Sequence, residues 1–327
     1  MPTDGLDIRI LRELTQAQTV LPATPGLRAS LRTIAATLGV APGTVRNRLG
    51  RMYTTGVLRG SSVYANPSLL GLRAAAFALE VASRKHKDEV VARLLAIPGA
   101  FFLQNFRGPL VGIAVVHEDD RALESLLQEI RRIAGARPVL RTSVPYPPCT
   151  ASLGRTDWRL LLRLTEGSFA SYQELARELR VSVRTLKRSI ARLTTGGAIF
   201  SVPTMDYRAL TGCVPADLLA TYTSGTARAE AEREILATVD AWLVYAGVWP
   251  EFGLYSLILP RVSSASDVAD AVRRLPGVRS ARMEFVEDHI DRAAALADHV
   301  RRRAEVELGR PVGAGARLPR PGAAAPS

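Results

Sequence analysis

The stretch VAPGTVRNRLGRM, Val40 to Met52, recurs in altered form 141 residues later as VSVRTLKRSIARL, Val181 to Leu193. With about 100° between successive residues, each stretch predicts a helix that is apolar on one side and basic on the other. One side can pack on a core while the other is free to meet a polyanion. The apolar positions are Val45, Leu49 and Met52 in the first copy and Leu186, Ile190 and Leu193 in the second.

These stretches belong to a longer internal repeat. Residues 30–59 and 171–200 align without a gap. Upstream, LDIRILREL from Leu6 matches TDWRLLLRL from Thr156, and the first copy carries extra residues around Pro22 and Pro25. Such self-similarity indicates that the 327-residue chain consists of two related halves. The identical pairs are Ser30/Ser171, Ala35/Ala176, Leu38/Leu179, Val40/Val181, Thr44/Thr185, Arg51/Arg192, Thr54/Thr195 and Gly56/Gly197.

The first part of each half predicts a winged helix-turn-helix unit, in which three helices precede a short extended pair, the wing. Ser182 is a good N-cap for the third helix of the second unit, and Pro42 suits the first helical position in the first unit. Gly39 suits a left-handed turn, whereas Arg180 in that conformation would cost about 1 kcal/mol. The expected helices and wings are 7–14, 31–38, 42–54 and 57–64, then 157–165, 172–179, 182–195 and 198–205.

The second part of each half alternates strand and helix patterns in the order βαββαβ, which is ferredoxin-like. Prolines within 144–154 mark the boundary between the halves. An amphipathic helix is expected over 288–308, followed by a disordered tail rich in Gly, Ala, Pro and Arg. The expected elements are 73–82, 86–96, 100–106, 110–117, 121–134 and 138–146, then 214–223, 227–238, 242–249, 253–260, 265–275 and 278–286.

The predicted fold class is therefore α+β, with tandem winged helix-turn-helix domains each followed by a ferredoxin-like domain. The expected domains are 1–71 (winged helix-turn-helix 1), 72–148 (ferredoxin-like domain 1), 149–212 (winged helix-turn-helix 2), 213–308 (ferredoxin-like domain 2 with a C-terminal helix) and 309–327 (disordered tail).

Composition narrows the class of partner and site. A formal net charge of +12 makes polyanions the first partners to consider. Only Cys149 and Cys213 are present, without a CxxC pair or a Cys/His cluster, so neither a disulfide framework nor a structural zinc site is expected. No cofactor is expected either. The sequence shows no basic leader before an apolar stretch and no run of about 20 apolar residues, which predicts a cytoplasmic protein that does not enter the membrane.

The order of a winged helix-turn-helix followed by βαββαβ resembles the Lrp/AsnC family of prokaryotic transcription regulators, twice between Leu6 and about Val286. Family members pair through the ferredoxin-like domain, often called the RAM domain. The resemblance thus implies an internal pseudo-dimer with two unlike DNA-reading helices, and a further homodimer of the chain. The resemblance rests on the same motifs in each half. In the first half they are Asp7, IAATLGVAPGTVRNRLGRM, Gly56 and NPSLLG ending at Gly71, and in the second half Asp157, LARELRVSVRTLKRSIARL, Gly197 and DYRALTG ending at Gly212.

This resemblance implies a regulator that binds specific double-stranded DNA, with the third helix of each unit in the major groove. Arg and Lys side chains there would contact guanine edges or phosphates, and Asn47 would suit adenine. A run of charges is more often a solvated helix face, but here the charges lie on the third helix of the unit. The expected DNA-binding residues are Thr44, Arg46, Asn47, Arg48, Arg51 and Arg59 in the first unit and Arg184, Thr185, Lys187, Arg188 and Arg192 in the second.

The resemblance also implies a small-molecule effector near the turn between the second and third strands, commonly marked by Gly closely followed by Asp. FRGPLVG, Phe106 to Gly112, and VWPEFGL, Val248 to Leu254, lack that Asp. Amino-acid sensing is therefore not expected, and the class of any effector stays open.

Two alternatives to a DNA-binding regulator remain. Some proteins that resemble the family are sirohaem decarboxylases, which would need His and Arg side chains around a tetrapyrrole. The segment FFLQNFRGP offers Arg107 but no histidine, and no nucleophile–base pair, P-loop or GxGxxG motif is recognisable, so no enzyme is expected. The other alternative is an interaction scaffold that binds no DNA. Steep salt dependence of DNA binding would distinguish a regulator from a scaffold.

Overall fold

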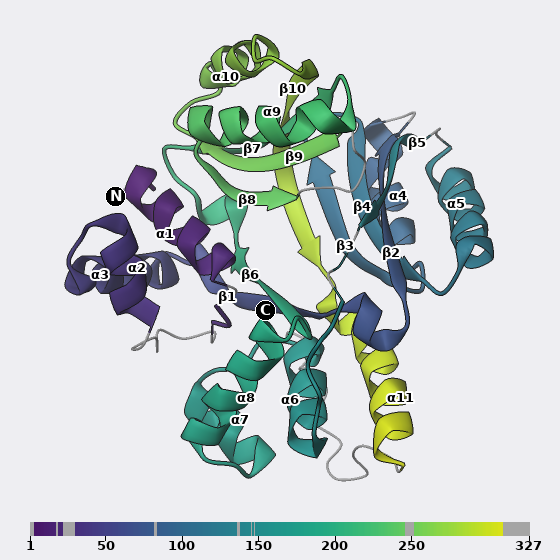
Figure 1. Ribbon diagram of the computed structural model, residues 1–327. Coiled ribbons are helices and arrows are strands. Elements are labelled where there is room, and N and C mark those ends of the chain that lie inside the picture. The colour runs from purple at the N-terminus through teal and green to yellow at the C-terminus, as the bar shows by residue number, and fades with distance from the viewer. Residues whose placement is uncertain are drawn as a thin grey trace, which may run out of the picture.

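The computed structural model describes residues 3–17, 19–21, 30–81, 84–135, 138–144, 146, 148–245 and 252–309. The predicted tail beyond Gly309 and residues 248–251 of the second strand turn lie outside the described residues. Two three-helix heads and one large sheet make up the molecule (Figure 1). No helix in the described ranges is long and apolar enough to span a membrane.

Each head is a helix-turn-helix unit. The third helix of each buries the positions predicted to be apolar, except that Ile190 is half-buried and Ser189 beside it is buried. The turn before that helix is left-handed in both heads, at Gly39 with φ 65° and at Arg180 with φ 55°. Head 1 contains α1 (Gly5–Gln16), α2 (Ser30–Leu38) and α3 (Pro42–Thr54), and head 2 contains α6 (Arg155–Glu166), α7 (Tyr172–Leu179) and α8 (Val183–Thr195).

A two-stranded ribbon joins the heads. The extended pair predicted after each third helix is a single strand in the structure, and its partner comes from the other half of the chain. Strands β1 (Leu58–Ala65) and β6 (Ile199–Met205) run antiparallel, from the pair Leu58 and Met205 to the pair Ala65 and Ile199. A lone strand leaves its backbone groups unpaired, and each half satisfies those of the other. The ribbon therefore ties the halves together as a pseudo-dimer.

Both ferredoxin-like units form with the predicted βαββαβ order. Each has its fourth strand beside its first, which gives the orders β5-β2-β4-β3 and β10-β7-β9-β8. The first contains β2 (Arg73–Glu80), α4 (Lys87–Leu95), β3 (Ala100–Phe106), β4 (Leu110–His117), α5 (Asp120–Ala134) and β5 (Pro138–Val144). The second contains β7 (Val214–Tyr222), α9 (Gly225–Thr238), β8 (Ala241–Tyr245), β9 (Phe252–Leu259), α10 (Ser264–Arg273) and β10 (Val278–Asp291).

Strand β10 joins the two units into one eight-stranded sheet, because it runs past β7 and pairs with the edge strand β3 up to Asp291 opposite Phe102. The helix predicted over 288–308 is thus wrong in its first residues. It begins as α11 (Ala297–Leu308), after a short 3-10 turn. Pairing with the open edge of β3 overrides the helical pattern of residues 288–291. The counterpart of this extension in the first half contains Pro147 and Pro148, which cannot donate to a strand ladder.

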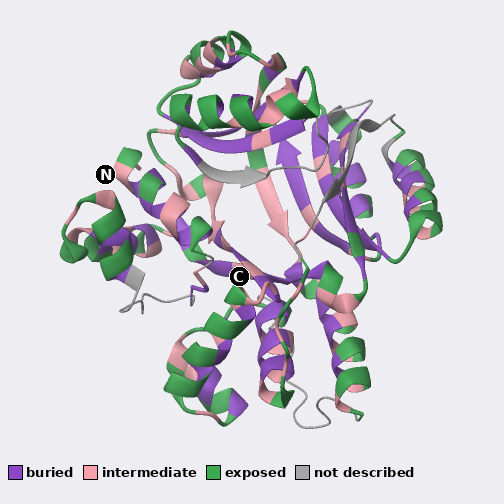
Figure 2. Cartoon of the chain, viewed as in Figure 1, coloured by how far each residue is buried: buried purple, intermediate pink, exposed green. Residues whose placement is uncertain are grey.

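The two heads pack against different parts of the molecule. Head 1 packs against the second unit, with α1 against β8 and Ile258 of β9 within its apolar core. Head 2 packs against α11, whose Val300 and Ala304 are buried in its core. Figure 2 shows buried strands and inward helix faces, while the outer sides of the heads are exposed. The remaining 3-10 turns are η1 (Pro67–Leu70), η2 (Arg84–His86), η3 (Tyr207–Ala209) and η4 (Ala293–Leu296).

Candidate nucleic-acid interface

The outer surface of α3 presents fewer free cations than its sequence suggests. Arg46 and Asn47 are exposed and Thr44 is half-buried. Among the described residues, Arg46 has no hydrogen-bond or ion-pair partner. Arg46 and Asn47 therefore remain available for a ligand.

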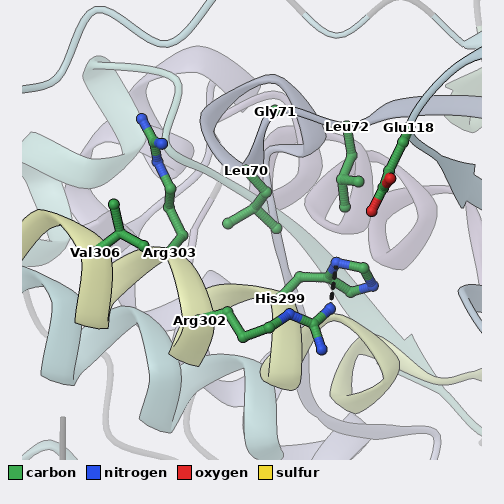
Figure 3. Close-up of a pocket in the computed structure, with 8 residues that line it drawn as sticks. All are labelled: Leu70, Gly71, Leu72, Glu118, His299, Arg302, Arg303 and Val306. Carbon is green, nitrogen blue, oxygen red and sulfur yellow. Dashed lines mark hydrogen bonds between the residues drawn. The ribbon is translucent and has the colours of Figure 1, made fainter. Parts of the chain in front are cut away.

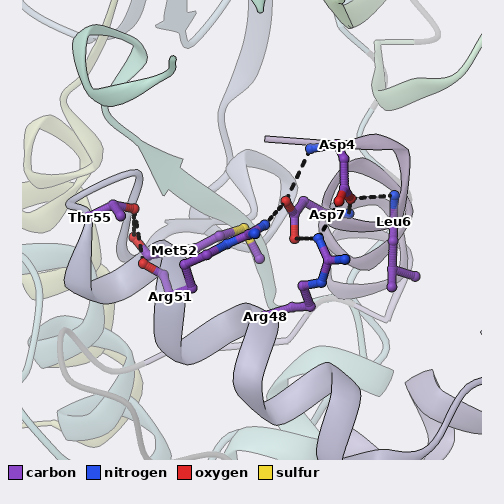
Figure 4. A network of polar contacts seen from close by, with 7 residues as sticks. All are labelled: Asp4, Leu6, Asp7, Arg48, Arg51, Met52 and Thr55. Atoms are coloured by element: carbon purple, nitrogen blue, oxygen red, sulfur yellow. Dashed lines mark hydrogen bonds and ion pairs between the residues drawn. The ribbon is translucent and has the colours of Figure 1, made fainter. Parts of the chain in front are cut away.

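Arg48 and Arg51 of α3 instead bind carboxylates at the start of α1 (Figure 4). Arg51 binds Asp7, and Arg48 binds Asp4 and lies 3.5 Å from Asp7. The Asp7 side chain is fully buried and also accepts the backbone N–H of Asp4 at 3.1 Å, which closes a capping box at the start of α1. One aspartate thus caps the first helix and holds the third helix against it.

Head 2 repeats this arrangement. Nη2 of Arg192 lies 2.5 and 2.6 Å from the two carboxylate oxygens of Asp157, whose side chain is almost completely buried. Asp157 also accepts the backbone N–H of Gly154 at 3.0 Å, the residue that precedes α6. Arg51 and Arg192 therefore occupy equivalent places, each linking the last turn of the third helix to the first turn of the first helix.

Burial and the nearby arginines act in opposite directions on these carboxyl groups. Burial raises the pKa of Asp7, and the backbone hydrogen bond from Asp4 and the charges of Arg51 and Arg48 oppose that rise only in part. For Asp4, burial also raises the pKa, but the hydrogen bond from Arg48 and further backbone hydrogen bonds bring it below its ordinary value. Asp4 is thus the member of the pair that stays ionised more readily.

Helix α8 exposes a denser group of cations. Arg184, Lys187 and Arg188 are all exposed, and Arg184 and Arg188 have no hydrogen-bond or ion-pair partner in the described part of the chain. Lys187 Nζ lies 5.5 Å from the centre of the Tyr172 ring, a cation–π distance. Thr185 is exposed and its hydroxyl shares a hydrogen bond with Ser182 Oγ, the N-cap of the helix.

Arg59, expected in the wing, lies on the ribbon. It forms an ion pair with Asp206, which joins β1 to the residue that follows β6, and the Arg59 side chain remains 62% exposed. This pair therefore links the two halves on the surface of the ribbon.

The sequence-predicted residues thus fall into two groups. Those on the outer surfaces are Thr44, Arg46, Asn47, Arg184, Thr185, Lys187 and Arg188. Those whose guanidinium groups pair with carboxylates of the same chain are Arg48, Arg51, Arg59 and Arg192, of which Arg59 and Arg192 are also exposed. The role of Asp7 and Asp157 as anchors was missed, although both recur in the repeated first-helix motif and Arg51 and Arg192 are identical in the aligned third helices.

At the first of the two strand turns, between β3 and β4, a buried lysine binds the backbone. Lys87 is buried and donates to the carbonyl oxygens of Phe106 and, at 2.6 Å, Gly108. These carbonyls belong to the last residue of β3 and to the segment that joins β3 to β4. No group of three or more His, Cys, Asp or Glu side chains placed to hold a metal occurs in the described ranges.

Comparison with known proteins places this geometry in a family. No family model matches the chain. Over 136 residues, 41% of the chain, it is 32% identical to the HTH-type transcriptional regulator LrpA of Mycobacterium tuberculosis and covers 85% of that protein. Among solved structures, the siroheme decarboxylase NirDL aligns over 92% of this chain and 99% of its own with a TM-score of 0.51 at 15% identity, which shows a shared fold. The same protein in complex with an iron-uroporphyrin III analogue gives the same values.

The match to LrpA spans 41% of this chain and 85% of that regulator. The fold likeness to NirDL spans both halves. Together with the two helix-turn-helix heads and the two βαββαβ units, these findings agree on one classification. The chain belongs to the Lrp/AsnC family of transcription regulators and carries the family's two domains in duplicate.

Proposed function

We propose that the protein is a transcription regulator that binds specific double-stranded DNA with α3 and α8 as two unlike recognition helices. The observation that carries this proposal is the exposed cationic surface on the third helix of both heads, the element that enters the major groove in helix-turn-helix proteins. The regulator LrpA, similar to one half of the chain, supports the same function.

The proposed base and phosphate contacts come from the outer group of side chains. In head 1 these are Thr44, Arg46 and Asn47, and in head 2 Arg184, Thr185, Lys187 and Arg188. Arg48, Arg51 and Arg192 act as positioning residues, because their guanidinium groups bind carboxylates of the first helix. Arg59 belongs with them as a link across the ribbon.

The ribbon supports simultaneous contact by both heads. Helix α3 leads into the ribbon at Leu58 and α8 at Ile199, which lie at opposite ends of the antiparallel pair. Leu58 and Ala65 are seven residues apart, and at about 3.3 Å per residue they are separated by roughly 23 Å. In this proposal the two heads, at opposite ends of the ribbon, reach major grooves about 34 Å apart on one face of the duplex.

The heads differ in free charge, so the proposed operator is asymmetric. Head 2 offers Arg184, Lys187 and Arg188, whereas the free arginine of α3 in the described structure is Arg46. Each phosphate contact contributes about 0.9 to the slope of log K against log salt. Head 2 therefore supplies most of the salt-dependent affinity in this proposal.

The purified full chain would be used to select bound fragments from random double-stranded DNA at low salt. We expect enrichment of a two-part motif with unlike halves. Arg188→Ala should weaken binding to the selected site and reduce its salt slope, while Arg233→Ala on α9, with the same charge change outside the two heads, should leave both unchanged. Failure to enrich any sequence, or equal effects of the two substitutions, would exclude the proposed interface.

The fold likeness to NirDL favours a second candidate, an enzyme that acts on a tetrapyrrole. Incubation of the purified chain with an iron tetrapyrrole, followed by absorbance spectroscopy, tests it directly. A bound, protein-perturbed spectrum and loss of carboxylate from the tetrapyrrole, with no DNA enrichment, would replace the regulator proposal with the enzyme.

A further inference from the structure

A short segment after α1, Thr19–Leu21, here called the clasp, connects the two heads. Val20 is buried in the apolar core of head 2, whereas Leu21 is buried in the core of head 1. Two neighbouring residues of the first half thus belong to the cores of different heads. They open the stretch TVLPATPGL, residues 19–27, in which the first half carries residues that the second half lacks.

The clasp is held on both strands of the ribbon by hydrogen bonds to two buried serines. The carbonyl oxygen of Thr19 accepts from Oγ of Ser61 in β1 at 3.1 Å and from Oγ of Ser201 in β6 at 2.9 Å. The backbone N–H of Leu21 donates to Ser61 Oγ at 3.0 Å, and the carbonyl of Leu21 accepts the backbone N–H of Ser61 at 3.2 Å. Because both serines are buried, loss of these bonds would leave polar groups unsatisfied. The clasp is therefore fixed to strands from both halves of the chain.

Head 2 adds a contact from its second helix. The Tyr172 hydroxyl, at the start of α7, donates to the carbonyl oxygen of Val20 at 2.5 Å. The Tyr172 ring packs against Phe169, with 5.6 Å between the ring centres, and Nζ of Lys187 in α8 lies 5.5 Å from the ring centre. In head 1, burial and next the neighbouring Tyr172 raise the pKa of Tyr53 in α3. The clasp thus contacts a tyrosine that is close to residues of both third helices.

The second half makes the corresponding connection differently. Residues 167–171 join α6 to α7, and Phe169 among them is buried in the core of head 2 itself. The clasp therefore comes from one half and adds to the ribbon that lies between the heads (Figure 1). Two-stranded ribbons twist more strongly than wider sheets and are marginally stable alone. The ribbon by itself would fix the angle between the heads only weakly.

Packing is incomplete on the side of head 2 that faces away from head 1, where α11 lies (Figure 1). Helix α11 is attached to head 2 through its buried Val300 and Ala304. An open recess of about 350 Å³ separates α11 from the joint that leads from the ribbon into the sheet, with His299 and Leu72 on its lining (Figure 3). Head 2 and α11 thus leave space against the sheet on that side, while the clasp restrains head 2 on the side of head 1.

We infer that the clasp fixes the distance and the angle between the two heads, and that Val20 and Tyr172 thereby determine which spacing between operator halves the regulator accepts. The second part rests on the proposed function. Neither residue belongs to the proposed DNA contacts, so both act as positioning residues. A rigid link gives the second head a high effective concentration at one spacing of its site and a low one at others.

Distances between spin labels on the full chain test the clasp without DNA. The labels are attached at Ala36→Cys on α2 and Arg177→Cys on α7, which are exposed and equivalent positions of the two heads, after both native cysteines are replaced by serine. The clasp variant is Val20→Ala/Tyr172→Phe, which keeps the aromatic ring of residue 172. We expect one narrow distance distribution in the parent and a distribution at least twice as wide in the clasp variant.

Val181→Ala is the matched control, since it removes the same methyl groups from a residue of head 2 that packs against the same core. It should lower the melting temperature and keep the narrow distribution of the parent. An unchanged distribution in the clasp variant, or equal widening in Val181→Ala, would overturn the inference. If the double variant does not fold, Tyr172→Phe alone makes the same test, because it removes one hydrogen bond to the clasp and retains the ring.

A second experiment uses the operator selected under the proposed function and changes the spacing between its halves by two base pairs. This change turns one half by about 70° around the duplex. The parent should then lose at least tenfold in affinity, and the clasp variant less than threefold. Equal losses would show that the clasp does not set the spacing. If the parent binds no DNA at all, the proposed function fails, whereas the label distances still decide whether the clasp fixes the heads.

Discussion

Arg192 of α8 lies against Asp157 of α6, with one guanidinium nitrogen 2.5 and 2.6 Å from the two carboxylate oxygens. Arg51 and Asp7 form the same link in head 1. Each pair joins the last turn of the third helix to the first turn of the first helix. The pairs thereby set the orientation of the third helix relative to the rest of the head.

Substitution of Arg192 should therefore affect folding more than DNA contact. Arg192→Ala leaves the buried carboxylate of Asp157 without its guanidinium, and we expect the free energy of unfolding to fall by about 1–3 kcal/mol. Arg188→Ala, on the exposed side of the same helix, should change it by less than about 0.5 kcal/mol. Urea unfolding of both variants makes the comparison, and Asp157→Asn with Arg192→Ala completes a double-mutant cycle. Equal stability of the two single variants would contradict the positioning role.

A left-handed residue offers a second test on the turn of head 2. Arg180 has φ 55°, a conformation that costs a side-chain-bearing residue about 1 kcal/mol, and its side chain is exposed. Arg180→Gly should raise the free energy of unfolding by up to about 1 kcal/mol. The matched change in head 1, Gly39→Ala, should lower it by a similar amount, because Gly39 has φ 65° and no atom lies close enough to clash with a new Cβ. A loss of stability in Arg180→Gly would show that the arginine side chain contributes more than the strain it introduces.

The local elements were predictable because their signals are local. Helix α3 has the predicted bounds, Pro42–Thr54, and so do α7, β3 and β4. Apolar periodicity and capping residues are patterns within a few neighbouring positions of the sequence. Because the sequence repeats, the same pattern in both halves supports the same element in each. The pairing of β1 with β6 was not predictable, since either strand alone is compatible with a hairpin inside its own half.

Long-range partners limited the prediction of the site in the same way. Arg51 and Arg192 read as outward cations on a helical wheel, but they lie beside the carboxylate of another helix. A helical wheel shows the direction in which a side chain leaves its helix. It does not show how far a long side chain extends towards a neighbouring helix. The sequence did contain a signal for these pairs. An aspartate in the first helix and an arginine in the third helix both recur in the two halves, as Asp7 with Arg51 and as Asp157 with Arg192.

Asn66 at the joint between ribbon and sheet provides a third test. Its fully buried side chain donates to the carbonyl of Gly197 in the other half at 2.6 Å and accepts the N–H of Ser68 at 2.9 Å. Asn66→Ala should lower the free energy of unfolding by about 1–3 kcal/mol, because it removes the hydrogen bonds that this fully buried side chain makes to Gly197 and Ser68. The control is Asp206→Ala, which removes the corresponding cap of η3 at a more exposed place and should cost less. Thermal unfolding of the two variants measures both losses of stability. A larger loss of stability for Asp206→Ala than for Asn66→Ala would contradict this role of Asn66.

The pH dependence of stability gives the fourth test, at a buried acid where the two sheet units meet. Asp217 of β7 accepts from Gln104 of β3 at 2.8 Å, and its other oxygen has no partner among the described residues. Burial raises the pKa of Asp217 to about 7, against a lowering hydrogen bond from Ser256 and with a further rise from Glu284. The ordinary value is 3.8, so the folded protein keeps this proton up to about pH 7 while the unfolded chain releases it near pH 4.

A carboxyl whose folded-state pKa is raised favours folding fully below its unfolded value and loses that contribution as the pH rises. Ionisation of Asp217 should therefore lower the free energy of unfolding by up to about 1.4 kcal/mol per pH unit between roughly pH 4 and 7. Above that range it should cause no further change. Asp217→Asn cannot ionise, so its free energy of unfolding relative to the parent should rise from pH 5 to pH 7 and then level. Urea unfolding at pH 5, 6, 7 and 8 measures this difference, with exposed Asp240→Asn as the control. A difference that stays constant over these four pH values would show that Asp217 is ionised in the folded protein throughout, and that the donors around it outweigh its burial.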